Sequence, residues 1–298
     1  MSQAGQPGHA PDESDAYTRL VVQVRGWREA GDYRRADQMA RAGITAVEQT
    51  LGPTARELVV LLNELGIINK YRGQFREAER LYQRALAIHQ LDGDVACADV
   101  AAILHNLGGL AHAQGRHRAA RRWARRGLAI RESLPDSDPT ALAADRVAPA
   151  AILIDLGEYS SADALLASAL AQYERTLGAE HHAVGVTLHN IGCLQYRSGS
   201  VTDAAATLHR AYGVKVAALG PRHPDLAITL YARGRCAGEV DDPTTAAAHF
   251  RHAIDLLEGA VADDQPTLVA CRAKLASLLA ATPSAPDGGT HTCRTDTE

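Results

Sequence analysis

The chain has 298 residues, 31 basic and 35 acidic side chains, and a net charge of −4. This balance gives no electrostatic reason to expect a nucleic acid or an anionic membrane as a partner. The five cysteines are odd in number and lack CxxC spacing, which indicates reduced thiols in a cytoplasmic protein. Because no stretch reaches about 18 apolar residues and the N-terminus carries no basic and apolar signal, we expect neither a membrane span nor secretion.

The two ends of the chain contain little that a fold can bury. Residues 1–16 combine Gly, Pro, Ser and acidic side chains, and residues 282–298 have a similar composition. Segments of this kind cannot bury enough apolar surface to offset the entropy lost on folding. We therefore expect two disordered tails around one continuous ordered region at 17–281.

A period of 42 residues runs through this region. Glycines recur at that spacing, Asp241 occupies the next position in the series, and an alanine follows each of these positions by five residues. A fixed period of this length predicts a solenoid, in which neighbouring units bury the apolar face that one unit cannot bury alone. Solenoids mostly hold other molecules, which disfavours an enzyme. The glycines of the series are Gly31, Gly73, Gly115, Gly157 and Gly199.

Each unit contains two predicted helices. In the second unit, apolar residues recur at helical spacing over 54–72, Gly73 ends that helix, and a second apolar face runs through 75–90. A small residue recurs in the first helix of the units, and it would let the two helices of a pair approach closely. The predicted pairs are 17–50, 54–90, 96–133, 140–175, 181–218 and 223–260, followed by an unpaired helix at 265–281 that would cap the array.

This pattern resembles the tetratricopeptide repeat, in the 42-residue version found in kinesin light chains. The resemblance rests on the alanine series that includes Ala78, on the helix phrases LHNLG at 104–108 and LHNIG at 188–192, and on the linker LGPRHPD at 219–225. It covers 17–281 and implies an all-α, right-handed α-solenoid of about six helix pairs with a C-terminal capping helix. The composition, rich in alanine and arginine and poor in lysine, points to a bacterial protein.

Two positions depart from the repeat. Val24 replaces the small residue in the first helix of the first pair, and Pro149 stands inside the first helix of the fourth pair. Because proline removes a helical hydrogen bond and its ring clashes with the preceding turn, we expect helix 140–156 to be kinked or split and the array to bend there.

The resemblance also implies that the first helix of each pair lines a concave groove, where the side chains immediately before the small residue touch a ligand. Asn106 and Asn190 stand where relatives keep an asparagine that binds the main chain of an extended peptide, and an amide can donate and accept there at once. In the alternative interpretation, these asparagines cap or bridge helices within the scaffold. The full set of predicted groove residues is Asn63, Lys70, His105, Asn106, His112, His189, Asn190, Cys193, Tyr196, Tyr231 and Arg235.

We therefore favour a non-catalytic interaction scaffold that binds a peptide or protein segment in the groove and needs no cofactor. The alternative is a small-molecule-binding regulatory or biosynthetic protein, which could be an enzyme, with a pocket around the kinked helix 140–156 between the histidine-bearing helices. A self-associating protein, with helix 265–281 docked on a second copy, is a third hypothesis.

Two further patterns bear on function. His189 and Cys193 lie four residues apart on one helix face, but zinc needs three or four ligands and a nucleophile needs an oxyanion hole, which no motif supplies. We therefore predict no metal site and no catalytic residue. In the basic segment 116–131, Arg118, Arg121, Arg122 and Arg125 follow helical spacing, and we interpret them as the solvated outer face of a second helix rather than a nucleic-acid site.

Overall fold

The computed structural model describes residues 13–91, 93 and 96–281, and over these ranges the chain forms helices and no strand. The predicted all-α class is confirmed: each predicted pair corresponds to two consecutive helices, and an unpaired helix follows the last pair. In chain order the helices are α1 (Glu13–Glu29), α2 (Tyr33–Leu51), α3 (Leu58–Tyr71), α4 (Phe75–Leu91), α5 (Ala98–Ala113), α6 (His117–Ser133), α7 (Pro139–Asp155), α8 (Tyr159–Leu177), α9 (His182–Arg197), α10 (Val201–Leu219), α11 (Leu226–Glu239), α12 (Pro243–Leu257) and α13 (Pro266–Ala281).

The two expected tails fall mostly outside the described part of the chain, which leaves out residues 1–12 and 282–298. The N-terminal boundary differs from the expectation, because α1 begins at Glu13.

The 42-residue period is present in the backbone as well as in the sequence. All five glycines of the series have positive φ, between 70° and 95°, and each stands in the turn between the two helices of a pair. Asp241 has φ 59° and is the one non-glycine with positive φ among the described residues. The left-handed turn that glycine adopts without a steric penalty is therefore kept at Asp241, where the side chain tolerates it.

Small residues hold the helices of a pair close together, as predicted. A Cβ atom added to Gly66 of α3 would lie 2.4 Å from the ring of Tyr82 in α4, and one added to Gly234 of α11 would lie 2.6 Å from the ring of Phe250 in α12. Both rings are almost fully buried. In the first pair, Val24 occupies the same position and is itself fully buried, so a larger side chain fills that interface.

The expected break at Pro149 does not occur, because α7 runs unbroken from Pro139 to Asp155 with Pro149 inside it. Apolar side chains on both sides of the proline are buried, with Ala143 before it and Ala150 and Ile154 after it. Their packing holds the helix together across the one hydrogen bond that the proline removes. Of the two predicted outcomes, a kinked or a split helix, the split was wrong for this reason, and the kink stays a prediction.

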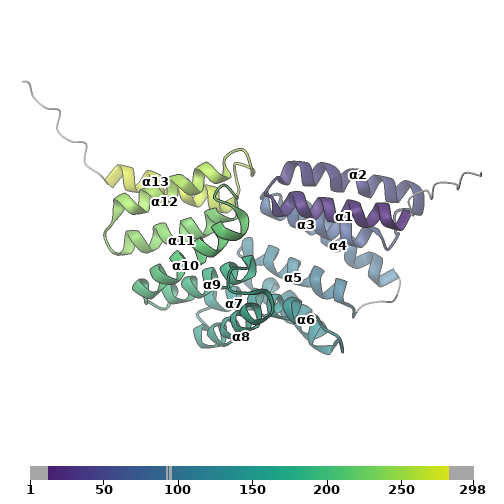
Figure 1. Cartoon of the computed structure of the whole chain (residues 1–298), viewed down its shortest axis with the longest axis horizontal. Coiled ribbons are helices and arrows are strands. Elements are labelled where there is room, and N and C mark those ends of the chain that lie inside the picture. Colours follow the sequence, from purple (N-terminus) through teal and green to yellow (C-terminus); the bar gives the residue numbers. More distant parts are fainter. Residues whose placement is uncertain (1–12, 92, 94–95, 282–298) are drawn as a thin grey trace, which may run out of the picture.

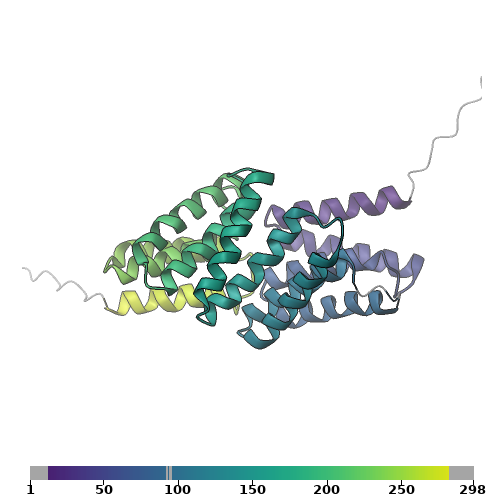
Figure 2. The ribbon, with the colours of Figure 1, turned by 90° about the horizontal axis from the view of Figure 1, so that it is seen from below.

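The helix pairs follow an arc that returns toward its own beginning, so that the purple N-terminal helices and the yellow-green C-terminal helices approach each other across the molecule (Figure 1). Seen from below, the teal helices α6–α8 lie between these two ends (Figure 2). The turn after α1 reaches the turn before α11, where a Cβ on Gly31 would lie 2.7 Å from Pro224. The amide of Ala262 donates a hydrogen bond of 3.0 Å to the carbonyl of Arg72. Contacts between turns therefore close the arc.

Candidate ligand-binding groove

The concave side of the array holds a cavity of about 570 Å³, which we call the groove cavity. Helices α9 and α11 supply the largest share of its wall, and residues of α3, α5, α7, α10 and α13 complete it. Its volume lies within the range of about 300–1,000 Å³ that is typical of ligand pockets. Seven predicted groove residues line it: His112, His189, Asn190, Cys193, Tyr196, Tyr231 and Arg235.

Two arginines of the groove cavity, Arg197 and Arg235, have no acidic partner among the described residues. The guanidinium of Arg235 lies 4.3 Å from the ring centre of Tyr196, and the Tyr196 hydroxyl donates a hydrogen bond of 2.6 Å to Glu239. Within the described residues, no carboxylate lies at ion-pair distance from Arg235 or from Arg197, which also lines the cavity. A stacked guanidinium is held in place and keeps its N–H donors available for an anionic group.

The opposite wall of the groove cavity contains an ion cluster that the sequence analysis missed. The Lys215 ammonium lies 2.7 Å from Asp225 Oδ2, and His182 Nε2 lies 2.9 Å from the same oxygen. Burial opposes ionisation of Asp225, but Lys215 and His182 outweigh it and hold the pKa of this carboxyl well below its usual range. Asp225 is therefore ionised and fully paired, and it does not neutralise Arg197 or Arg235.

The pair His189 and Cys193 forms an uncharged part of the wall, with Cys193 Sγ 3.6 Å from His189 Nε2. Burial lowers the pKa of His189 to about 3, and the nearby Lys215 charge lowers it further in the same direction. Burial also raises the pKa of Cys193 to about 12. At neutral pH both groups are uncharged, whereas a reactive cysteine needs a thiolate beside a cation or a base.

His105 and Asn106 of α5 do not line the groove cavity. The amide nitrogen of Asn106 donates a hydrogen bond of 2.9 Å to Oδ1 of Asn63 on α3. His105 Nδ1 lies 2.9 Å from Asp145, whose other oxygen pairs with Arg131 at 2.8 Å. Asn106 therefore bridges two helices of the scaffold. Asn190 differs from Asn106. Its side-chain amide donates a hydrogen bond of 3.1 Å to the Val186 carbonyl of its own helix, and its side chain lines the cavity.

Lys70, the last of the predicted groove residues, also lies outside the groove cavity. Burial lowers the pKa of its ammonium, which lies 5.8 Å from the ring centre of Tyr71. On the same helix, Glu64 is 3% exposed and binds Arg25 at 2.7 Å and Arg28 at 2.9 Å. Glu64 and Asn63 of α3 are thus bound by α1 and α5, respectively, rather than open to a ligand.

A second cavity of about 550 Å³ adjoins the first, and the two share Tyr71 and Asp225. It lies where α1 and the turn after it meet the turn before α11, and the rings of Tyr33 and Tyr71 stack there with 5.5 Å between their centres. This cavity exists because the arc closes, a feature that the period does not encode.

Several contacts between successive first helices share one spacing in sequence. Four side-chain pairs are separated by 43 residues, one more than the period: Asn63–Asn106, His112–Asp155, His182–Asp225 and Tyr196–Glu239. A helix residue therefore meets the residue one period and one position further along. This spacing is the sequence signal that could have identified Asp155 and Asp225.

The basic face of α6 lies away from the groove. Arg118, Arg121, Arg122 and Arg125 are exposed, and Arg121 pairs with Glu158 at 2.8 Å. No helix of the described chain is both long enough and apolar enough to cross a membrane.

The comparisons with known proteins agree with this architecture. A family model described as tetratricopeptide repeat matches residues 62–133 and 150–215. No curated protein sequence matches the chain. Among solved structures, NprR in complex with its cognate peptide NprX has a TM-score of 0.66 at 14% identity, and the match covers 91% of this chain and 73% of that one.

Two more solved structures show the same fold. A Rap protein complexed with competence and sporulation factor has a TM-score of 0.61 at 11% identity, over 89% of this chain and 74% of its own. The repeats of a putative kinesin light chain from Podospora anserina have a TM-score of 0.50 at 19% identity, over 70% of this chain and 98% of theirs. At these identities the likeness concerns the fold.

Proposed function

Since the chain is a tetratricopeptide repeat protein, we propose that it is a non-catalytic scaffold that binds an extended peptide or protein segment in the groove cavity. The observation that carries the proposal is a cavity with an apolar floor and two arginines that no carboxylate of the described part of the chain neutralises. The ligand carries an apolar side chain and a carboxylate, and the carboxylate comes either from an acidic side chain or from the C-terminus of the segment. The cytoplasm is the expected location, and no cofactor takes part.

Each part of the ligand has a matching group in the cavity. Arg235, held over Tyr196, binds the carboxylate, because a planar guanidinium can donate two parallel hydrogen bonds to it. Asn190 binds the main chain of the segment. Ala151, Ile154 and Ile228 provide the apolar floor. The complexes of NprR with NprX and of Rap with its factor support this mode, since those solenoids of similar fold hold peptides or factors.

The proposal is tested with a peptide selected from a random display library against the purified chain. Arg235→Gln is expected to weaken binding about 10–100-fold, because a hydrogen bond to a charged group contributes roughly 1.5–3 kcal/mol. Arg118→Gln, an exposed arginine on the outer face of α6, is the matched control and leaves the affinity unchanged. Equal affinity of both variants and the parent chain for every selected peptide would contradict the proposal.

A second candidate is a small molecule as the natural occupant, and the volume and apolar lining of the groove cavity favour it. Native mass spectrometry of freshly purified protein distinguishes the two. A retained mass of a few hundred daltons, lost in the Arg235→Gln variant, would favour the small molecule over the peptide.

A further inference from the structure

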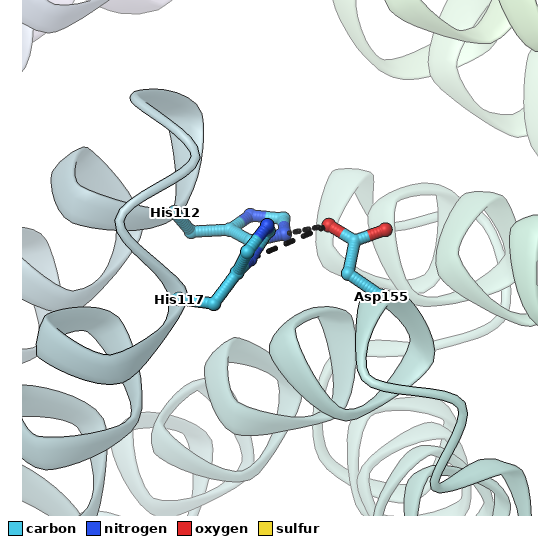
Figure 3. Close-up of side chains that lie close together, drawn as sticks. All are labelled: His112, His117 and Asp155. Carbon is cyan, nitrogen blue, oxygen red and sulfur yellow. Dashed lines mark hydrogen bonds and ion pairs between the residues drawn. The ribbon is translucent and has the colours of Figure 1, made fainter.

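Beside the groove cavity, three side chains from separate helices converge on one point (Figure 3). His112 lies near the C-terminal end of α5, His117 is the first residue of α6, and Asp155 is the last residue of α7. One ligand atom from each lies within 4.8 Å of the other two. His112 Nε2 is 2.7 Å from Asp155 Oδ2, and His117 Nδ1 is 4.0 Å from the same oxygen.

The environment of these groups fits a bound cation. His117 Nδ1 is buried and makes no hydrogen bond to any described residue, although its ring is turned toward the carboxylate. A buried nitrogen without a partner costs free energy that a bound ion would recover. The three side chains are partly exposed, so an ion can reach them from solvent.

We propose that His112, His117 and Asp155 bind one divalent transition-metal ion, with Zn²⁺ as the best match. Two imidazole nitrogens and one carboxylate oxygen are a common zinc ligand set. Ligand bonds of about 2.0–2.2 Å place the ligand atoms roughly 3.3–3.5 Å apart around a tetrahedral ion. To reach this geometry, Asp155 must move away from His112 and toward His117, and the two imidazole nitrogens must approach each other from a separation of up to 4.8 Å.

The proposed ion site lies at the edge of the groove cavity and between two helix pairs. His112 and Asp155 also line the groove cavity, so the ion stands at the edge of that cavity. Three protein ligands leave a fourth position for water or for a donor atom of a ligand. The ion also links the turn between α5 and α6 to the end of α7, and thereby joins the third helix pair to the fourth. Ion binding does not require a peptide and is independent of the proposed function.

The experiment uses the full chain, prepared without a polyhistidine tag and freed of metal by dialysis against a chelator. Titration with ZnCl₂ at pH 7.5 is followed by calorimetry, and one ion per chain is expected. His117→Ala and Asp155→Asn each lower the affinity at least about tenfold, a loss that even changes behind the ligands produce. His209→Ala, an exposed histidine on α10, is the matched control and leaves the affinity unchanged.

Two readouts keep the test decisive. Circular dichroism of each variant checks folding, since His117 stands at a helix start and Asp155 at a helix end. Co²⁺ in place of Zn²⁺ gives visible absorption typical of four-coordination in the parent chain, which both ligand variants lose. The assignment would be overturned if no zinc bound. It would also be overturned if both ligand variants kept the affinity and a control without the histidines near the two chain ends, His9→Ala with His291→Ala, lost it.

Discussion

The stretches His105–Asn106 on α5 and His189–Asn190 on α9 stand two periods apart in the same position of the repeat, and their surroundings differ completely. On α5, Asn106 donates a hydrogen bond to Asn63 and His105 lies against Asp145 within the scaffold, whereas on α9 the two side chains line an open cavity. The neighbouring helices explain the difference. Asn106 meets Asn63 at a separation of 43 residues, while the residue 43 positions before Asn190 is Val147, which has no side-chain acceptor.

The repeat period therefore fixes where a residue stands but not whether it is available. Whether a polar side chain is free to bind a ligand depends on the residue that the adjacent repeat places in contact with it. In the N-terminal half, polar side chains of neighbouring helices bind one another. Asn63 accepts from Asn106, Glu64 pairs with Arg28, and Asp145 pairs with Arg131. In the C-terminal half the corresponding positions are apolar or already paired, and a cavity remains.

The largest effect is expected at Asp145 of α7, which lies against His105 of α5 and pairs with Arg131. Asp145→Ala leaves Arg131, whose side chain is 8% exposed, without its carboxylate. Leaving one member of a buried pair unpaired costs about 3–5 kcal/mol. Urea denaturation followed by circular dichroism measures the loss. Glu174→Ala, which removes an exposed pair with Arg210, is the control and costs less than about 1 kcal/mol.

The next effect is the pH dependence of stability that comes from His189, a residue of the groove cavity. The pKa of His189 is lowered to about 3 in the folded chain, so the unfolded chain binds the proton more readily between that value and about 6.5. Stability contributed by the neutral imidazole is thus complete above pH 6.5 and is lost as the pH falls toward 3. Between pH 7 and 4.5 this amounts to at most about 3 kcal/mol.

The measurement compares the parent chain with His189→Gln, which removes the titrating group. The free energy of unfolding of the parent should fall more steeply between pH 6.5 and 4.5 than that of the variant. Parallel curves for the two proteins would mean that His189 is not held neutral by burial.

The closure of the arc gives a smaller effect with a well-matched control. Gly31→Ala and Gly115→Ala both place alanine at a positive φ, 75° and 70°, which costs about 1–2 kcal/mol. Only Gly31 also contacts another part of the chain, with Pro224 2.7 Å from the added atom, and such overpacking adds about 1–3 kcal/mol. Thermal unfolding of the two variants should differ by this amount, and small-angle scattering should show expansion only for Gly31→Ala. Identical behaviour would argue against the closed arc.

The sequence predicts the architecture of this chain far better than its site. The period is a local property, and it was sufficient to place the helix pairs and to predict a turn at Asp241. The unbroken helix at Pro149 was not predictable, because packing on both sides of the proline outweighs its local preference. The meeting of Gly31 with Pro224 depends on the small rotation that accumulates over several pairs, which no single repeat encodes.

For the candidate site, the resemblance selected helices that line the groove cavity but did not distinguish paired from open positions. Asn106 and Asn190 have the same sequence context, and only the identity of the residue 43 positions earlier separates them. Lys215 was missed because it lies on a second helix, which the family pattern places outside the groove, yet its long side chain reaches inward to Asp225.

The smallest effect on stability tests the central claim most directly, because Asn106→Ala and Asn190→Ala should separate stability from binding. Loss of the hydrogen bond to Asn63 makes Asn106→Ala less stable by about 1 kcal/mol and leaves peptide affinity unchanged. Asn190→Ala keeps its stability within about 0.5 kcal/mol, because an exchange at a cavity wall breaks no contact between helices. It weakens binding of the selected peptide at least about threefold, as expected for one lost hydrogen bond. Equal losses of affinity in the two variants would contradict the distinction between a bound face and an open one.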